Sequence, residues 1–313
     1  MKSVGAGNRR QPPALAPTLA LVVFLAFVVA ALSAATVHAQ GDSPASAGRA
    51  PIPPSTVLPD LDRLPPDIRA IRERGYLIVA MMLQDRYPFY YVNDTGELAG
   101  LEVDLAKDIA RHLGVDVVFD RTPQTFNGVV DYVAQGFADI GMSKLSITLP
   151  RAQQVLFTRP YMVLPQTILV NRAALAASRA GSNALEVLRL PGQRIAVMDG
   201  SVFVEYGRQL FPQAILVPYD NPEDLFDAVI NGDVVATTYD QAQTSGLLYQ
   251  RPELRIFLQE YIIPGIIDPL AIAVPWQSVW LHQWLNTYLE LRDETWTVEQ
   301  LFEMYPRPGA GER

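Results

Sequence analysis

Hydrophobic residues after Asp60 fall into two repeating arrangements. Short apolar runs, which predict buried strands, alternate with segments in which apolar residues recur every three or four positions, as on one face of a helix. Such an alternation is typical of α/β layers. In the first part of the chain it predicts strands at residues 76–81 and 115–119, a third strand entered through 136–140, and helices at 101–113 and 127–135, the first of which ends at Gly114.

A second series of strands and helices begins near Leu190. Asn221 provides a helix N-cap, followed by Pro222 in the first turn and two acidic residues near the positive end of the helix dipole. The series predicts strands at 194–198, 214–217 and 234–238, and helices at 202–210, at 222–231 and after Asp240. It repeats the organisation of the first series, which predicts two similar lobes.

Two extended apolar segments, residues 161–171 and 262–274, separate the two series and are suited to cross between lobes. Two crossovers imply a first lobe built from both ends of the chain and a second lobe inserted between them. We therefore predict an α/β protein of two doubly wound lobes, with residues 60–163 and 262–306 in lobe 1 and 164–261 in lobe 2. Helices at 280–291 and 298–305 would return to lobe 1.

The first 39 residues have the features of a signal peptide. Basic residues precede an apolar stretch from Ala14 to Ala35, and small residues frame Val37-His38-Ala39, which predicts cleavage after Ala39. The stretch approaches the roughly 20 residues that span a bilayer, so an uncleaved anchor is the alternative. Either alternative predicts export, with a flexible linker over residues 40–59 and a tail over 307–313.

Composition and charge exclude several classes of protein. The chain has 313 residues, of which 49% are hydrophobic and 19% charged, so it can build globular cores. Of its 25 basic residues three precede Ala39, and the remaining 22 face 33 acidic residues, which gives the mature chain a net charge of −11. So acidic a surface is repelled by phosphate backbones, and we expect no nucleic-acid partner.

The absence of cysteine excludes thiol catalysis, disulfides and sulfur-ligated metals. Of the three histidines, His38 lies beside the predicted cleavage site, and His112 and His282 lie in helical patterns. We interpret the last two as ordinary helix residues. The sequence accordingly predicts no catalytic residue, no metal site and no cofactor.

Several blocks of sequence, in their order and spacing, resemble the family 3 solute-binding proteins, which are the periplasmic receptors of polar amino-acid ABC importers. The resemblance runs from about Leu64 to Tyr305. The blocks that carry it are Arg74–Val79, Tyr87-Pro88-Phe89, Gly96–Ala106, Ser143–Arg151, Phe157–Tyr161, Asp199-Gly200-Ser201 and Asp233–Asp240. It implies the bilobed periplasmic-binding-protein fold, with the ligand held between the lobes at the carboxyl ends of the strands and the crossovers acting as a hinge.

The resemblance also implies which residues hold a zwitterionic ligand. Arg151 matches the family's carboxylate-binding arginine, whose guanidinium can form two parallel hydrogen bonds with a carboxylate. Ser143 and Ser146 would add donors to the same oxygens. Asp240 matches the acid that receives the ammonium group. The alternatives are a surface charge for Arg151 and a helix cap for Asp240.

Weaker candidates complete the predicted site. Gly200 and Ser201 open a helix whose free N–H groups can bind an anion, although Asp199 could simply cap that helix. Phe126 and Tyr87 fall where the family places aromatic rings against the ligand, but core packing would explain them equally. Asp85 is a further candidate acid.

Two residues depart from the family pattern. Lys144 stands where a small polar residue is usual, and Val202 stands where Thr or Ser often helps to bind a carboxylate. Lys144, together with Arg86, could neutralise a second acid of the ligand, which would favour a dicarboxylate; both could equally be solvated surface charges.

The leading prediction is thus the periplasmic binding component of an ABC importer, a monomer whose partners are an amino acid or related small carboxylate and a permease of the inner membrane. A membrane-tethered sensory domain on the same fold is the alternative. Dehydratases that resemble the family carry an acid three positions after the ammonium-binding Asp; Gln243 stands there, and an amide cannot act as a general acid. A peptidoglycan lyase would require a further catalytic domain.

Overall fold

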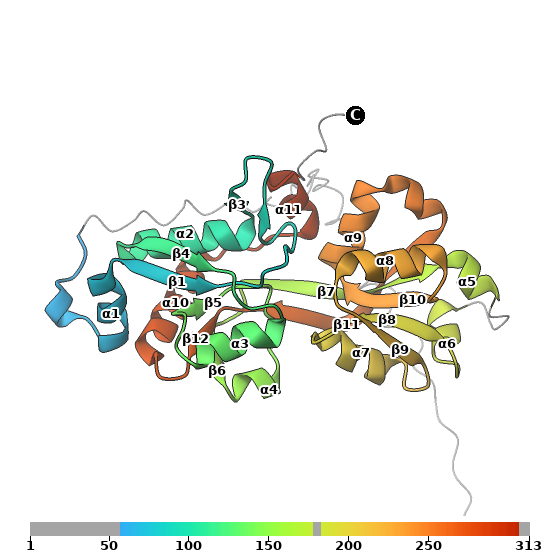
Figure 1. The fold of residues 1–313 in the computed structure, drawn as a ribbon, viewed down its shortest axis with the longest axis horizontal. Helices are drawn as coiled ribbons and strands as arrows, with labels where there is room; N and C mark the ends of the chain where they lie inside the picture. The colour runs from blue at the N-terminus through green and yellow to red at the C-terminus, as the bar shows by residue number, and fades with distance from the viewer. Residues whose placement is uncertain (1–56, 178–182, 307–313) are drawn as a thin grey trace, which may run out of the picture. The chain divides into compact units, whose positions relative to one another are not determined.

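Two five-stranded sheets, each covered by helices, organise the chain in the computed structural model, which describes residues 57–177 and 183–306 (Figure 1). The predicted signal peptide, the linker up to residue 56 and the tail lie outside the described residues. Within 57–177 and 183–306, no helix has the length and apolar character needed to cross a membrane.

The first sheet has the strand order β4-β1-β5-β12-β6, in which β1 pairs in parallel with β4 and β5 while β12 runs antiparallel to β5 and β6. Helix α2 lies along one side of it and α3 along the other (Figure 1). The elements are β1 (Tyr76–Ala80), β4 (Asp116–Asp120), β5 (Ile140–Gly141), β6 (Val155–Phe157), β12 (Ala273–Pro275), α1 (Pro66–Arg74), α2 (Leu101–Leu113), α3 (Phe126–Ala134), α4 (Leu149–Ala152) and α10 (Val279–Arg292), with a 3-10 turn at Leu61–Arg63.

The second sheet has the order β11-β7-β10-β8-β9, in which β10, β8 and β9 are parallel and β7 and β11 antiparallel. Helix α8 covers one side and α7 the other (Figure 1). The elements are β7 (Met162–Asn171), β8 (Arg194–Met198), β9 (Ile215–Tyr219), β10 (Ala236–Asp240), β11 (Leu258–Leu270), α5 (Arg172–Ala177), α6 (Ala184–Leu188), α7 (Val202–Leu210), α8 (Pro222–Asn231) and α9 (Gln241–Gln250), with a 3-10 turn at Pro252–Ile256.

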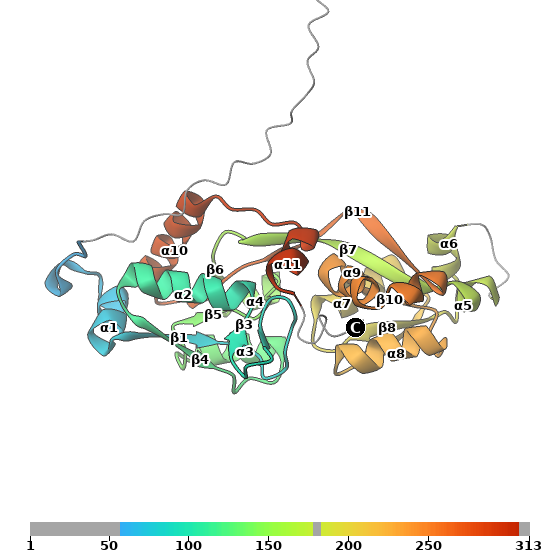
Figure 2. The same cartoon turned by 90° about the horizontal axis from the view of Figure 1, so that it is seen from above.

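The two predicted crossovers are the paired strands β7 and β11, which run side by side in both views (Figure 2). Their pairing is interrupted by a bulge between Ile262 and Ile267, where Gly265 has a φ of +77°. Both strands belong to the second sheet, and each contains one of the predicted boundaries between lobes, so the exact boundaries stay a prediction.

Helix α2 begins at a backbone position that only glycine suits. Gly100 has a φ of +121°, in the left-handed half of conformational space, which favours glycine. It immediately precedes α2, which packs against β4 and β1. The Phe89 and Pro88 carbonyls lie so close that a Cβ on Gly100 would be 2.5 and 2.7 Å from their oxygens. The turn before α2 therefore tolerates no side chain.

The two helices after β12 pack differently from each other. Helix α10 contacts α1 and β12, as expected for a return to the first lobe. Helix α11 (Val298–Met304) contacts α9 of the second sheet as well. Its Phe302 ring stacks on Tyr87, with ring centres 5.9 Å apart, and on Tyr249 of α9, at 5.5 Å. The C-terminal helix therefore joins both lobes.

Candidate functional site

Arg151 is a buried guanidinium, 6% exposed, on the short helix α4. Thr148 caps that helix through its side chain, and the Arg151 side chain donates from Nε to Asn127 Oδ1 at 3.0 Å and from Nη1 to the Ser146 carbonyl at 3.1 Å. Burial lowers its pKa, partly offset by Asp268, yet a guanidinium stays charged. Within the described part of the chain Nη2 has no hydrogen-bond partner.

A small inner cavity of about 10 Å³ lies beside Arg151. It has room for about one water molecule. Its lining joins residues of the first lobe to residues of the second and of β11: Phe126, Lys144, Ser146, Arg151, Ser201, Val202, Phe203 and Asp268. Five of the candidates from sequence, Arg151, Ser146, Lys144, Phe126 and Ser201, therefore meet around one space.

The start of α7 is capped by Ser201 and not by Asp199. The Ser201 hydroxyl accepts from the Phe203 N–H at 3.2 Å and donates to the Met198 carbonyl at 2.6 Å. Gly200 has a φ of +63° and positions the turn without lining the cavity. The start of α7 thus lines the same cavity as Arg151, and the Ser201 hydroxyl is already hydrogen-bonded within the chain.

Ser143 is fully buried and does not line the cavity. Its hydroxyl accepts from the Met82 N–H at 3.0 Å and shares a 2.9 Å hydrogen bond with the Tyr90 hydroxyl. Ser143 therefore fixes the loop after β5 in place, and its role as a ligand donor stays a prediction.

Lys144 and Asp240 form a buried ion pair across the two lobes, with side chains 4% and 0% exposed. The lysine ammonium also lies 5.3 Å from the centre of the Phe89 ring and 5.2 Å from that of Tyr239, which are cation–π distances. Asp240 is in addition the N-cap of α9 and accepts from the Gln243 N–H at 3.2 Å. Asp240 therefore caps α9, as the alternative interpretation has it, and the ammonium group that it binds in this structure is that of Lys144; its role as a partner of a ligand ammonium stays a prediction.

Sequence reasoning missed two buried acids near this pair. Asp268 on β11 is 1% exposed, receives a 3.0 Å hydrogen bond from the Ser146 hydroxyl, and has no partner for Oδ1 among the described residues. Burial, and next Asp240, raise its pKa to about 6. No periodic signal in the extended crossover marks this residue.

Glu102, the second missed acid, is fully buried on α2. Its Oε1 accepts from the Lys144 backbone N–H at 2.6 Å and from the Tyr161 hydroxyl. Burial raises its pKa to about 7, against the lowering effect of these hydrogen bonds. The helical spacing places Glu102 on the same face as Leu105 and Ile109. An acid within this otherwise apolar face is the feature of the sequence that could have identified Glu102 as a buried residue.

Glu102→Gln should abolish one pH-dependent part of the stability. An acid whose pKa of about 7 in the folded protein exceeds its ordinary value of 4.5 stabilises the fold fully only below the lower value, and this contribution is lost as pH rises through 7. The amide, which cannot ionise, should therefore be stabilising by about 2 kcal/mol more at pH 8 than at pH 5 relative to wild type. Urea unfolding at both pH values measures this difference; an equal effect at the two would contradict it.

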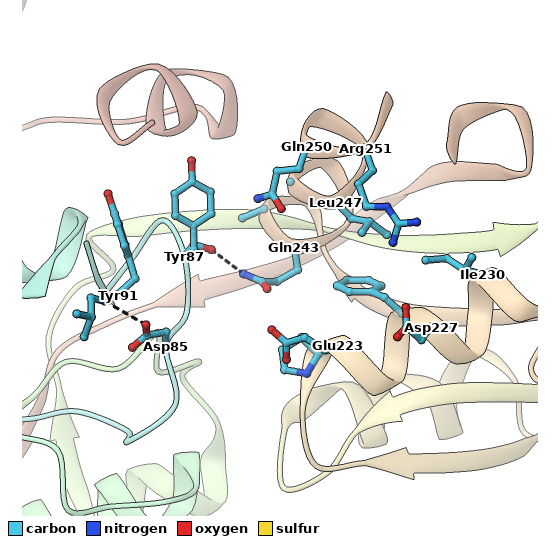
Figure 3. A pocket seen from close by; sticks show the side chains of 15 residues that line it. Asp85, Tyr87, Tyr91, Glu223, Asp227, Ile230, Gln243, Leu247, Gln250 and Arg251 are labelled. Atoms are coloured by element: carbon cyan, nitrogen blue, oxygen red, sulfur yellow. Dashed lines mark hydrogen bonds between the residues drawn. The ribbon is translucent and has the colours of Figure 1, made fainter. Parts of the chain in front are cut away.

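Tyr87 and Asp85 lie apart from the inner cavity, around a larger outer one of about 610 Å³ (Figure 3). Asp85 pairs with Arg121 at 2.8 Å and accepts from the Val92 N–H at 3.1 Å. The Gln243 amide points toward the first lobe and donates to the Tyr87 carbonyl at 3.1 Å. The structure therefore divides the predicted site into an inner group around Arg151 and an outer group beside Tyr87.

The two helical histidines make ordinary contacts. His112 is hydrogen-bonded to the Asp108 carbonyl on α2, and His282 to the Phe157 carbonyl. Across residues 57–177 and 183–306, no three acids or histidines cluster in a way that could hold a metal ion.

Known proteins are similar to this chain over most of its described length. The model of the bacterial extracellular solute-binding proteins, family 3, matches residues 78–306. The putative ABC transporter arginine-binding protein 2 of Escherichia coli is 25% identical over 223 residues, which are 70% of this chain and 86% of that protein. Cyclohexadienyl dehydratase of Pseudomonas aeruginosa is 29% identical over 186 residues, 59% of this chain and 66% of the enzyme.

A solved structure gives the same result for the fold. The ancestral amino acid-binding protein that preceded cyclohexadienyl dehydratase superposes with a TM-score of 0.62 at 27% identity, covering 76% of this chain and 98% of its own. The predicted bilobed fold of two doubly wound lobes is confirmed.

Proposed function

Because the chain belongs to family 3 of the bacterial extracellular solute-binding proteins, we propose that it is the binding component of an ABC importer, holding an amino acid or related small carboxylate between its lobes. The buried guanidinium of Arg151 carries this proposal. Two of its nitrogens are fixed by Asn127 and Ser146, so the group is rigid, while donors on Nη2 stay available to a carboxylate. The relatives named as arginine- and cystine-binding proteins support the same class of ligand.

The cellular setting follows from the same proposal. Residues 1–39 would export the chain, residues 40–59 would tether or release it, and the closed lobes would present the ligand to a permease in the inner membrane. We propose that the protein works as a monomer, because a two-lobed site encloses its ligand without a second chain.

A dehydratase function is less well supported by the residues present. A general acid has to donate a proton to the leaving group, and the side chain at position 243 is an amide that donates to the Tyr87 carbonyl. We therefore propose binding without catalysis.

Arg151→Ala should weaken carboxylate binding at least about 100-fold, because a charge-assisted, bidentate contact would be lost. Thermal shift of the purified full chain against the amino acids and common mono- and dicarboxylates identifies a ligand, which at 100 times its Kd adds about 2.7 kcal/mol to the free energy of unfolding. Titration calorimetry then gives the Kd of each variant.

Arg159→Ala is the matched control, because Arg159 is exposed and its one ion pair among the described residues is a long surface contact of 3.8 Å with Glu290. It should bind like wild type. Equal affinities of the Arg151 and Arg159 variants would contradict the role of Arg151, and the absence of any ligand in the panel would contradict the proposed function itself.

A further inference from the structure

We propose that Lys144 occupies the ammonium position of the inner site as part of the protein, so that the site selects a small carboxylate without an amine over the corresponding amino acid. This inference rests on the proposed function and names the class of ligand for the same site. It depends on the Lys144–Asp240 pair, on the charges that remain around the cavity, and on the way in which Lys144 is held.

The acid that a ligand ammonium would need is already paired within the chain. Asp240 is 0% exposed and the Lys144 ammonium bonds directly to its carboxylate. The rings of Phe89 and Tyr239 flank the same ammonium, so both the anion and the aromatic faces that favour a cation are in use. A second ammonium at this place would have to displace the first into a region without solvent, which is strongly unfavourable.

The charges around the cavity favour an anion. Arg86, like Lys144 and Arg151, is buried, at 2% exposure; its guanidinium lies 5.5 Å from the centre of the Phe126 ring, which lines the cavity. Arg86 forms no ion pair with a described residue, and its Nε has no hydrogen-bond partner among them. Three cations thus face two acids.

The two acids are Asp240, which is paired with Lys144, and Asp268, which faces Arg151. The third acid nearby, Glu102, is fully buried and accepts from the Lys144 backbone N–H and the Tyr161 hydroxyl, forms no ion pair with a described residue, and has its pKa raised by burial to about 7. The surplus is therefore one positive charge. A zwitterion leaves this surplus unchanged, whereas a monocarboxylate neutralises it, and a buried site gains most from neutrality.

Lys144 is also held in place from the side of its own lobe. Its φ is +51°, a left-handed conformation that is uncommon for a residue with a side chain and is maintained only where the surroundings enforce it. The Glu102 carboxylate supplies that restraint by accepting the Lys144 N–H at 2.6 Å. The Lys144 backbone is thus fixed within the first lobe while its side chain contacts Asp240 of the second.

The test compares matched monocarboxylate ligands that differ only in the α-amine: L-leucine with 4-methylpentanoate, and L-phenylalanine with 3-phenylpropanoate. Titration calorimetry of the full chain at about pH 6.5 gives a Kd for each. In the pair that wild type binds most tightly, the carboxylate without the amine should have a Kd at least 10-fold lower than that of the matching amino acid. Lys144→Ser, which vacates Asp240, should reverse the preference, because the ligand amine then supplies the missing partner.

The outcomes separate the two proposals. If wild type binds an amino acid as tightly as its deamino analogue or more tightly, the inference is overturned while the proposed function stands. If none of the carboxylates or amino acids binds, the proposed function fails. Circular dichroism checks that Lys144→Ser folds; if it does not, the paired measurements on wild type still decide.

Discussion

Gly100→Ala should destabilise the protein by about 4 kcal/mol, enough to lower its Tm by about 8–16 °C. The φ of +121° is accessible only to glycine, and strain of this kind contributes about 1–3 kcal/mol. The added Cβ would in addition lie 2.5 Å from the Phe89 oxygen and 2.6 Å from the Phe89 carbonyl carbon, which are backbone atoms that cannot rotate away. Overpacking against such atoms adds about 1–3 kcal/mol. Urea unfolding followed by circular dichroism measures the loss.

Gly96→Ala is the matched control. Gly96 is also in the left-handed region, at +80°, but nothing lies within 4 Å of a Cβ placed there. Its loss should be about 1 kcal/mol, the conformational part alone. If the two variants were equally stable, the close approach of the Pro88–Phe89 backbone would not contribute to the destabilisation by Gly100→Ala.

Asp240→Asn should lower the free energy of unfolding by about 3 kcal/mol, since it leaves the Lys144 ammonium buried without an anion. Asparagine retains the capping of α9, so the change isolates the charge. The pair joins one lobe to the other, so separation of the lobes would let water reach the unpaired lysine. The loss of stability therefore cannot exceed the free energy needed to separate the lobes and hydrate the lysine. Chemical unfolding measures the free energy of unfolding, and small-angle scattering measures whether the two lobes have separated.

Lys144→Met in the Asp240→Asn background should restore most of that stability, because an apolar side chain of similar length can replace a buried ion pair at little net cost. The double-mutant cycle therefore predicts a large coupling between the two positions. Losses that simply add would show that Lys144 and Asp240 act independently.

The arrangement of the helices and strands was predictable because it depends on local periodicity. The strand at Arg194–Met198 and the helix at Val202–Leu210 have the predicted ends, since alternation and capping both mark them. The strand predicted at 234–238 is instead Ala236–Asp240, because its register with β7 begins at Ala236, a tertiary fact that no local pattern carries. Helix α1 and the short hairpin of β2 (Tyr91–Val92) and β3 (Leu98–Ala99) were not predicted.

The candidate site was predictable only in part, because sequence indicates which groups lie near each other but not which of them pair. Resemblance placed Arg151 and Asp240 at the cleft, and the structure brings Arg151 to a cavity. It did not indicate that Lys144 reaches Asp240, since the two residues come from different lobes. The sequence analysis missed Asp268 for a related reason. Asp268 lies in an extended strand, where burial depends on the partner strand and not on the neighbouring residues in the sequence.

The stacking of Phe302 between Tyr87 and Tyr249 has a consequence for how affinity is set. Parting the lobes must separate Phe302 from at least one of these rings, and an aromatic pair contributes about 0.5–1.5 kcal/mol. The C-terminal helix thus biases the population of closed molecules before any ligand arrives. Because an apparent Kd scales inversely with the fraction of competent molecules, a residue far from Arg151 tunes how much solute in the surroundings is needed for saturation.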